Sequence, residues 1–253
     1  IKSLVDAVQN GKDVHVVVEL QARFDEEANI GLSKVLTDAG VKVTFGIANL
    51  KIHSKLCLIT RNENGRRNRY ALISTGNFHE TTAQIYTDFS LLTARPEITT
   101  EVRHVFSFFS APYKSHLFNH LWVSPITQRV KISEQIDREI ELARTGKKTR
   151  IVLKLNNLAD EALIVKLYEA SQAGVLVDIC VRSVCSLVPG LPGISDRIRV
   201  ISIVDRFLEH SRVMIFHGGG DLRVFISSSD WMARNMDNRV EVSVPIYDEP
   251  PRF

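Results

Sequence analysis

The 253-residue sequence predicts an α/β protein made of two tandem α/β domains related by internal duplication. Runs rich in β-branched residues alternate along the chain with amphipathic helical segments, which is typical of α/β folds. One pattern also occurs twice: a buried strand, an acidic helix start, an Ala-Gly-Val helix end and another strand. Asp25 and Asp160 lie 135 residues apart in this pattern, and Gly40 and Gly174 lie 134 apart. Such regular spacing favours duplication over chance.

The composition is that of a globular chain, with 44% hydrophobic and 24% charged residues. No run approaches the roughly 18 consecutive apolar residues of a membrane span, and no secretory signal opens the sequence. The start at Ile1 without a methionine indicates a fragment. The net charge of +3 is too small to predict nucleic-acid binding. The three cysteines lie in or beside apolar runs, which predicts a reducing, cytoplasmic location.

The first half is expected to hold five strands and two helices. A buried strand at 14–20 precedes an amphipathic helix that starts at Asp25 and ends at Gly40, because acids favour a first turn and glycine a helix end. The polar sequence at 62–65 predicts a turn. The other expected elements are strands at 41–47, 50–59, 70–74 and 86–93, and a helix at 97–109.

The second half repeats this order after an irregular, aromatic linker at 111–125. A helix opens at Asp160 and closes at Gly174, and a Pro/Gly-rich loop covers 188–194. The other expected elements are a helix at 132–144 and strands at 151–155, 175–181, 200–204, 207–216 and 224–228. The predicted domains are 1–122 and 123–253.

The motif His53-Ser54-Lys55 carries the chemistry of the first half. Residues two apart on a strand point to the same face, so His53 and Lys55 are expected to project together. A neutral imidazole is a nucleophile near neutral pH, and an ammonium group beside it can hold an anion. The pair suits chemistry on phosphate. Taken alone, the motif more often marks a half-exposed strand edge with a surface lysine.

The second half supplies an equivalent motif, His210-Ser211-Arg212. Asp88 and Glu241 are also equivalent, at an offset of 153 residues. Each half therefore offers a histidine, a cation, a turn of small polar residues and an acid. A two-fold arrangement can bring both histidines to one site, where a carboxylate can orient each ring through its other nitrogen.

Two such motifs in duplicated α/β halves resemble the phospholipase D superfamily. Two positions depart from its pattern: Thr60 stands where the superfamily has an acid, and Arg212 stands where it has lysine. These departures argue against an ordinary phosphodiesterase. The segments KIHSKLCLITR, STGNFHETTAQIYTDFSLLT, LKLNNLAD, RFLEHSRVMIF and SSSDWMARNMDNRVEV are similar to the C-terminal catalytic half of bacterial polyphosphate kinases of the long-chain-forming type.

That resemblance implies reversible transfer of the ATP γ-phosphate to inorganic polyphosphate, with Mg²⁺ and a phosphohistidine intermediate. It implies a phosphohistidine at His53, nucleotide contacts at Tyr86, Arg182 and His210, and a magnesium-associated position at Arg23. Arginine does not ligate a cation, so we interpret Arg23 as an indirect contact through shared phosphate oxygens. The catalytic set is then His53, His210 and Lys55, and Arg212 joins the residues that bind substrate phosphate.

The expected partners are ATP or ADP and polyphosphate, with no nucleic acid. The resemblance also implies a homo-oligomeric full-length enzyme and leaves open a peripheral association with a membrane. Two other functions stay open: a phospholipase D-like phosphodiesterase that passes its phosphohistidine to water, and a polyanion-binding module without turnover. Among the site residues, Tyr86 is alternatively a core aromatic, and Arg182 a partner of Asp178 or Asp196.

Overall fold

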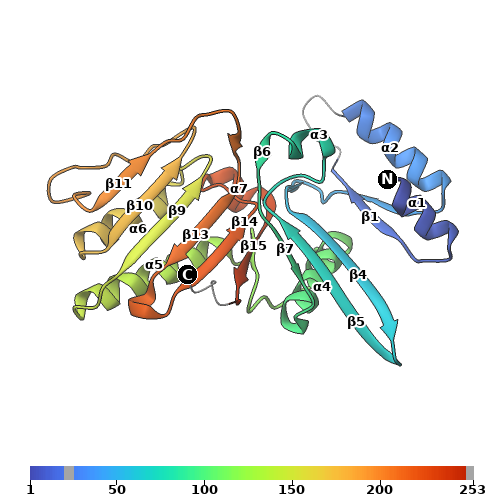
Figure 1. The fold of residues 1–253 in the computed structure, drawn as a ribbon, viewed down its shortest axis with the longest axis horizontal. Coiled ribbons are helices and arrows are strands. Elements are labelled where there is room, and N and C mark those ends of the chain that lie inside the picture. The colour runs from blue at the N-terminus through green and yellow to red at the C-terminus, as the bar shows by residue number, and fades with distance from the viewer. Residues whose placement is uncertain (20–25, 249–253) are drawn as a thin grey trace. The chain divides into compact units, whose positions relative to one another are not determined.

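The structure is a computed structural model that describes residues 1–19 and 26–248, with only the backbone described at 26–29 (Figure 1). Arg23 lies outside the described residues. Contacts within the chain define two compact units, one formed by 1–52 and 104–116 and the other by 53–103 and 117–253. The helix α4 (Pro96–Ser110) contributes residues to both units. The predicted domain boundary at 122/123 stays a prediction.

The first unit contains a parallel β-α-β arrangement. Strands β1 (His15–Val18) and β2 (Lys42–Phe45) pair in parallel with Val18 opposite Phe45. The other elements are α1 (Lys2–Gln9), α2 (Glu26–Asp38) and β3 (Lys51–Ile52). Gly40 follows α2 at a φ of 90°, a left-handed conformation that glycine adopts without strain, and the helix ends there as predicted.

In the second unit, an antiparallel sheet has the order β4-β5-β7. Strands β4 (Lys55–Glu63) and β5 (Arg66–Ser74) form a hairpin, and β7 (Ser90–Thr93) pairs with β5. The hairpin turns at Asn64 and Gly65, which both have positive φ, as a two-residue turn requires. The turn was predicted, but the strands extend further toward it than the sequence indicated. Between them and β7 lie α3 (Glu80–Ala83) and β6 (Tyr86–Thr87).

The larger sheet of this unit runs β11-β10-β9-β13-β14-β15, with β8 (Trp122–Ser124) also paired to β15. Its strands are β9 (Arg150–Leu155), β10 (Leu176–Val181), β11 (Ile198–Ile201), β13 (Arg212–Phe216), β14 (Arg223–Ser227) and β15 (Arg239–Ile246). Strands β9, β10 and β11 are parallel, whereas β13, β14 and β15 are antiparallel.

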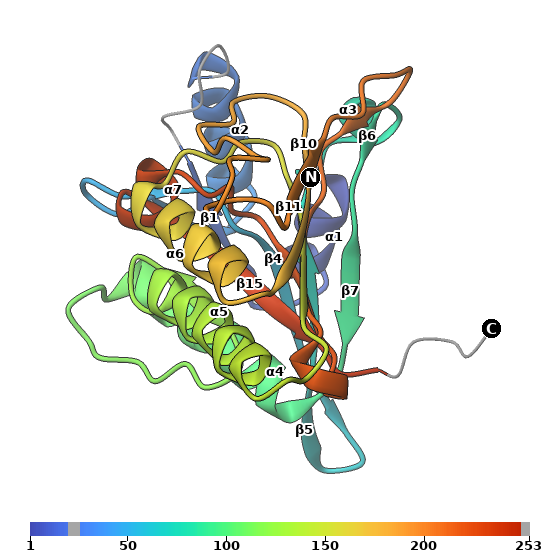
Figure 2. The same cartoon turned by 90° about the vertical axis from the view of Figure 1, so that its left-hand side faces the viewer.

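Helices α5 (Gln128–Arg144) and α6 (Glu161–Gln172) run side by side along this sheet (Figure 2). Asp160 caps α6 by accepting a hydrogen bond from the backbone N–H of Leu163 at 3.1 Å, which agrees with the predicted acidic helix start. The remaining elements are β12 (Leu208–Glu209), the short 3₁₀ turn η1 (Gly218–Gly220) and α7 (Ala233–Asp237).

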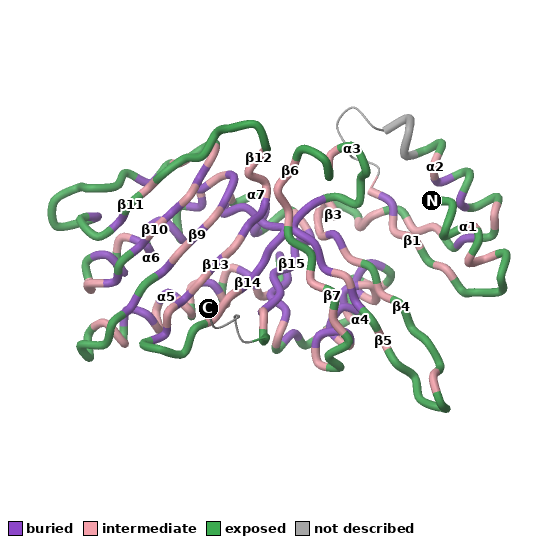
Figure 3. The backbone as a smooth tube through the Cα atoms, viewed as in Figure 1, coloured by how far each residue is buried: buried purple, intermediate pink, exposed green. Residues whose placement is uncertain are grey.

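The core of the second unit lies between these helices and the larger sheet. Figure 3 shows buried positions alternating along its strands, as expected where one face packs and the other does not. The largest fully buried side chains of this cluster include Trp231, Phe216, Ile132, Ile136, Ile151 and Leu153. Their burial makes the sheet a rigid base for the strand ends that carry the polar residues described below.

Two sequence-based expectations about the chain path are wrong. Trp122–Ser124 forms β8 within a segment that was expected to be an irregular linker. The single strands expected across His53 and across His210 are each broken at the histidine, because β3 ends at Ile52 and β4 starts at Lys55, while β12 ends at Glu209 and β13 starts at Arg212. In the described part of the chain, no helix is long and apolar enough to cross a membrane.

Candidate functional site

The two strand breaks place both histidines at the junction of the repeated halves. The backbone N–H groups of His53 and Ser54 both donate to the carbonyl oxygen of Val240, at 3.0 and 2.9 Å. The equivalent Ser211 N–H donates to the carbonyl of Thr87 at 2.8 Å. Each half therefore holds the histidine segment of the other by its backbone. These long-range bonds replace the strand ladder that a local sequence pattern predicts.

His53 is held by a carboxylate from the other half of the chain. Its Nδ1 lies 2.9 Å from Oε2 of Glu241. Glu241 is fully buried, and its oxygens also accept hydrogen bonds from Ser228 Oγ at 2.5 Å and Asn235 Nδ2 at 2.7 Å. Burial raises the pKa of Glu241, but His53, Lys55 and the Ser228 hydroxyl together hold that pKa below its ordinary value. Glu241 is therefore an anion at neutral pH.

His210 is held in the same way by Asp88, which comes from the first half. Its Nδ1 lies 2.9 and 3.0 Å from the two carboxylate oxygens. Thr75 Oγ1 donates to Asp88 Oδ1 at 2.6 Å. Burial raises the pKa of Asp88, whereas the hydrogen bonds from His210 and Thr75 lower it more, so this carboxyl group is also ionised.

The carboxylates determine which ring nitrogen is available for chemistry. A carboxylate only accepts hydrogen bonds, so Nδ1 of each histidine carries the proton and a neutral ring has its lone pair on Nε2. Burial is the largest cause that lowers the pKa of both His53 and His210. Both rings are therefore neutral near pH 7, and each directs Nε2 away from its carboxylate.

The two Nε2 atoms differ in their surroundings. Nη1 of Arg212 lies 3.1 Å from Nε2 of His210 and 2.9 Å from its carbonyl oxygen. The same atom lies 3.4 Å from Nδ1, so this cation lies against the ring and is not directed at one lone pair. Among the described residues, none donates a hydrogen bond to Nε2 of His53. The two rings therefore differ in their contacts with the neighbouring cations.

Lys55 lies next to His53 as the sequence predicted, although it opens β4 and is buried. Its Nζ donates to the carbonyl oxygen of His53. Burial lowers the pKa of Lys55 to about 7, with further lowering by Arg212 and Arg239 that Glu241 only partly offsets. Near pH 7 the Lys55 amine is therefore only partly protonated. A bound anion would raise its pKa and complete its protonation.

Asp230 binds Arg212, a cation that lies beside His210. It accepts hydrogen bonds from Arg212 Nε at 3.2 Å and from the backbone N–H of Asn156 at 2.9 Å. Asn156 also accepts from Arg182 Nε at 2.5 Å and donates to the carbonyl of His210 at 3.2 Å. The side-chain amide of Asn156 therefore links Arg182 to the backbone of His210. The alternative pairing with Asp178 is wrong, because Asp178 binds Arg150 and Arg199.

Tyr86 lies beside His210, with the two ring centroids 4.9 Å apart. Its strand β6 pairs in parallel with β12, so Tyr86 is opposite Leu208 and Thr87 is opposite Glu209. The carboxylate of Glu209 binds Lys154 at 2.9 Å and does not reach the imidazole. Asp88, one of the two acids that the sequence offered for orienting a histidine, fills that place instead.

A repeated set of hydrogen bonds surrounds both carboxylates, with every member offset by 153 residues. Thr75 and Ser228 are equivalent turn residues of the two halves. The hydroxyl group of Thr75 donates to Asp88 at 2.6 Å, and that of Ser228 donates to Glu241 at 2.5 Å. Each hydroxyl also accepts from the backbone N–H that follows that carboxylate, at 3.0 and 3.1 Å. Such matched detail supports the predicted duplication of the site.

One close approach breaks this symmetry. A Cβ atom at Gly76 would lie 2.0 Å from Oδ2 of Asp88, so no other residue fits there without moving the carboxylate. The equivalent position, Ser229, has a side chain that donates to the carbonyl of Asp230 at 2.8 Å. Gly76 is thus the position that lets Asp88 reach His210.

The structure brings together all the predicted site residues that it describes, namely His53, Lys55, Tyr86, Arg182, His210 and Arg212. Sequence reasoning missed Asn156 and Asn235, whose only signal is an amide in a buried segment. Asp230 falls at the offset of 153 from Asn77, and the sequence left it open between an ordinary turn residue and a neighbour of the site. Arg23 lies outside the described residues.

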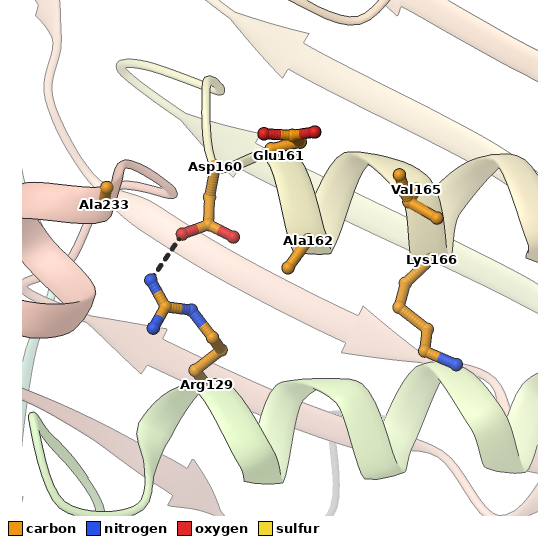
Figure 4. Close-up of a pocket in the computed structure, with 7 residues that line it drawn as sticks. All are labelled: Arg129, Asp160, Glu161, Ala162, Val165, Lys166 and Ala233. Carbon is orange, nitrogen blue, oxygen red and sulfur yellow. Dashed lines mark hydrogen bonds and ion pairs between the residues drawn. The ribbon is translucent and has the colours of Figure 1, made fainter.

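Figure 4 shows a separate hollow on the second unit that contains none of the predicted site residues. It is lined by Arg129, Asp160, Glu161, Ala162, Val165, Lys166 and Ala233. Arg129 donates to Asp160 at 2.8 Å and to Asp237 at 2.5 and 2.8 Å. The two cations that line the hollow, Arg129 and Lys166, are therefore already paired with acids. The residues that line it do not indicate a ligand.

Comparisons with known proteins agree with this geometry. The family model described as polyphosphate kinase C-terminal domain 1 matches residues 1–115, and the one described as C-terminal domain 2 matches residues 121–252. A polyphosphate kinase of Vibrio parahaemolyticus is 59% identical over 98% of this chain, and one of Escherichia coli is 58% identical over the same share. The chain spans 36% of the length of these relatives.

Solved structures show the same fold. The polyphosphate kinase of Porphyromonas gingivalis matches 98% of this chain and 38% of its own, with a TM-score of 0.89 and 42% identity. A yeast tyrosyl-DNA phosphodiesterase 1 mutant matches 94% of this chain and 78% of its own at 9% identity and a TM-score of 0.52, a likeness of fold alone. The prediction of two tandem α/β domains from the C-terminal half of a polyphosphate kinase is confirmed. The chain therefore belongs to the polyphosphate kinase family, of which it comprises the two C-terminal domains.

Proposed function

We propose that this chain carries the catalytic site of a polyphosphate kinase that transfers the γ-phosphate of ATP to inorganic polyphosphate through a phosphohistidine at His53. One observation carries the proposal. A buried anionic carboxylate holds Nδ1 of His53 at 2.9 Å, and no described residue donates to its Nε2. A neutral imidazole fixed in this tautomer is a nucleophile that needs no further activation.

The proposed first step forms a bond between Nε2 of His53 and the γ-phosphorus of ATP while the bond from that phosphorus to the bridging oxygen breaks. ADP leaves with the electron pair on that oxygen. In the second step a terminal phosphate oxygen of polyphosphate attacks the same phosphorus and the histidine leaves. The chain is then one phosphate longer, and the neutral ring is restored. Each step runs in both directions.

The role of His210 follows from its contacts. Its Nε2 meets Arg212 at 3.1 Å, and its ring faces Tyr86. We assign it to the leaving or attacking oxygen, as a direct contact to phosphate or, when Nε2 is protonated, as a proton donor. Lys55, Arg182 and Arg212 supply positive charge close to both histidines. Phosphoryl transfer depends mainly on such positioning and charge neutralisation.

Magnesium needs a separate argument. Within residues 1–19 and 26–248, no three or more His, Cys, Asp or Glu side chains gather in a way that could hold a metal ion. The acids nearest the histidines are engaged by the imidazoles, Ser228, Asn235 and Thr75. The described residues therefore do not fit a resident metal. We propose that Mg²⁺ enters with ATP as part of the substrate, because this ion prefers phosphate oxygens and water.

Family membership supports ATP and polyphosphate as the substrates, because the relatives are named polyphosphate kinases. The chain covers about a third of those relatives, so activity of the isolated chain is part of the proposal. Three free cysteines support a reducing, cytoplasmic location. Homo-oligomerisation and peripheral membrane association stay predictions.

The test is intact-mass measurement after incubation with magnesium and ATP labelled at the γ-phosphate. We expect one added phosphoryl group that is labile in acid and stable in base, located on His53, and its transfer to added polyphosphate. A His53→Ala variant serves as the control and should not be labelled. Cleavage of a phosphodiester with no transfer to polyphosphate would favour the hydrolase, and binding without any covalent label would favour a polyanion-binding module.

A further inference from the structure

Lys154 is a partly buried lysine that contacts both residues flanking His210. It lies on β9, opposite Val213 of the neighbouring strand β13, close to the point where that strand begins after the histidine. Its Nζ donates to Ser211 Oγ at 2.6 Å and to the Ser211 carbonyl oxygen at 3.4 Å, and it binds Glu209 Oε2 at 2.9 Å. One ammonium group therefore holds both sides of the strand break in which His210 stands.

The contacts of Glu209 extend this restraint to the acid that orients the histidine. The same oxygen that binds Lys154 accepts a hydrogen bond from Thr87 Oγ1 at 3.2 Å. Thr87 Oγ1 in turn accepts from the backbone N–H of His210 at 3.3 Å. Because Thr87 directly precedes Asp88, hydrogen bonds and one peptide link connect Lys154 to both members of the pair formed by His210 and Asp88.

The ion pair between Lys154 and Glu209 is a strong restraint for its position. The hydrogen bond from Lys154 is the largest cause that lowers the pKa of Glu209, so this carboxyl group is ionised at neutral pH. Only 22% of the lysine side chain and 23% of the glutamate side chain is exposed, so salt and water screen the pair less than a fully exposed one. Hydrogen bonds between two charged groups are also shorter and stronger than neutral ones.

The internal repeat has a residue of opposite charge at the position of Lys154. Glu19 matches Lys154 at the offset of 135 residues that also relates the two helix starts. Oε2 of Glu19 accepts from the backbone N–H of Ile52 at 2.6 Å. Ile52 directly precedes the histidine of its half, as Glu209 does in the other half. Both halves therefore use the same strand position to hold the residue before the histidine, once through the backbone and once through a side chain.

We propose that Lys154 is a positioning residue for His210, which fixes the strand break so that the imidazole meets Asp88 and directs Nε2 to the reacting phosphate. This inference rests on the proposed function. Lys154 acts through the backbone of residues 209–211 and not on the reacting atoms. A misplacement of about 1 Å can slow catalysis by about 10²-fold, whereas a partly exposed ion pair adds little to stability. Loss of Lys154 should therefore affect the rate much more than folding.

The test compares Lys154→Met with the wild type in the full-length protein that carries this chain. Methionine keeps the length of the side chain and removes its charge. We expect phosphohistidine formation at saturating ATP to slow by about tenfold or more, while the KM for ATP changes by less than about twofold. Crystal structures of both proteins give the distance from Nδ1 of His210 to the carboxylate of Asp88, which should lengthen in the variant.

A transplant of the first-half arrangement provides a rescue. Lys154→Glu alone places two carboxylates together, so it should be at least as slow as Lys154→Met. The double variant Lys154→Glu/Glu209→Ile copies the pair of Glu19 and Ile52 into the second half, where the new carboxylate can accept the backbone N–H at position 209. We expect it to recover most of the lost rate. Lys154→Arg keeps the charge and should also retain most of the activity.

Lys166→Met is the matched control, because Lys166 on α6 also pairs with two acids, Asp137 and Glu169, both at 2.9 Å. It should form phosphohistidine at the wild-type rate. A merely structural role for Lys154 would lower the melting temperature and the folded fraction of Lys154→Met but leave the rate per folded molecule unchanged. That result would overturn the inference, as would a variant crystal structure in which His210 still meets Asp88 as in the wild type.

Failure of the proposed function is a different result, namely a wild-type protein that forms no phosphohistidine from ATP. The crystallographic distance between His210 and Asp88 is measured without turnover, so it tests the positioning role in either case. A double variant that is no faster than Lys154→Glu would contradict the equivalence of the two strand positions and with it the inference. Wild-type labelling by ATP together with normal labelling of Lys154→Met would remove only the role of Lys154.

Discussion

Nδ1 of His53 lies 2.9 Å from Oε2 of Glu241, a residue 188 positions further along the chain. The reverse contact, between His210 and Asp88, spans 122 positions. The histidine of each repeat is therefore oriented by the acid of the other. Neither repeat holds a complete site, and the pairing couples the chemistry to correct assembly of the two halves.

Replacement of Glu241 by glutamine tests this orientation. The amide keeps the volume, and its oxygen can still accept from Asn235, but its nitrogen replaces the oxygen that faces Nδ1 of His53 and Ser228. The imidazole proton then moves to Nε2 and blocks the lone pair. We expect phosphohistidine formation to slow by about 10²-fold or more while the melting temperature changes little. Rapid-quench labelling measures the rate, and a wild-type rate would contradict the assigned tautomer.

Lys55 should make stability depend on pH. Its pKa is about 7 in the folded protein, well below the ordinary lysine value. Below about pH 7 both states bind the proton, and the folded state bears the full cost of a buried charge. Between about pH 7 and 10 the unfolded chain binds more protons, so the free energy of unfolding rises with pH, by a few kcal/mol in order of magnitude.

Urea unfolding at pH 7, 8, 9 and 10 measures this rise. The Lys55→Met variant should lack it, so its difference from the wild type changes with pH. Replacement of the partly exposed Lys131 by methionine is the control and should leave the wild-type slope. Parallel pH curves for the wild type and Lys55→Met would show that Lys55 has an ordinary pKa when folded.

Gly76→Ala tests the close approach of Asp88. The backbone at Gly76 is not in the left-handed region, so alanine causes no strain of its own there. The new methyl group would displace the carboxylate from His210, and we expect phosphoryl transfer to slow by about 10-fold or more. Ser229→Ala removes a side-chain atom at the equivalent position and should be near neutral. Transfer rates and melting temperatures of both variants decide, and a fully active Gly76→Ala would exclude this role.

The sequence predicted the fold class and most of the site because the signals are local and repeated. The pair His53 and Lys55 recurs as His210 and Arg212, and the acids Asp88 and Glu241 follow at a fixed offset. The crossed pairing was not predictable, because it depends on how the two halves assemble. The strand breaks were missed for the same reason: the apolar run after His53 looks continuous, and Val240 interrupts it from a distant part of the chain.

Other residues gave too weak a signal in the sequence. Asn156 is an amide in a loop, yet it joins Arg182 to the backbone of His210. Partner choice by charged side chains is a property of the packed structure, where desolvation decides which charges must pair.

The last prediction separates the two roles open to His210. His210→Ala should fold normally and transfer phosphate much more slowly, because the oxygen at that end of the site loses its proton donor or the phosphate loses a contact. His210→Gln keeps a hydrogen-bonding group but cannot cycle a proton. If glutamine restores most of the rate, His210 positions the phosphate; if it is as slow as alanine, His210 transfers a proton. Because the Arg212 cation lies against the ring of His210, 3.1 and 3.4 Å from its two nitrogens, it disfavours positive charge on that ring, and label should appear on His53 in the wild type. Label on His210 with His53 unlabelled would reverse the two assignments.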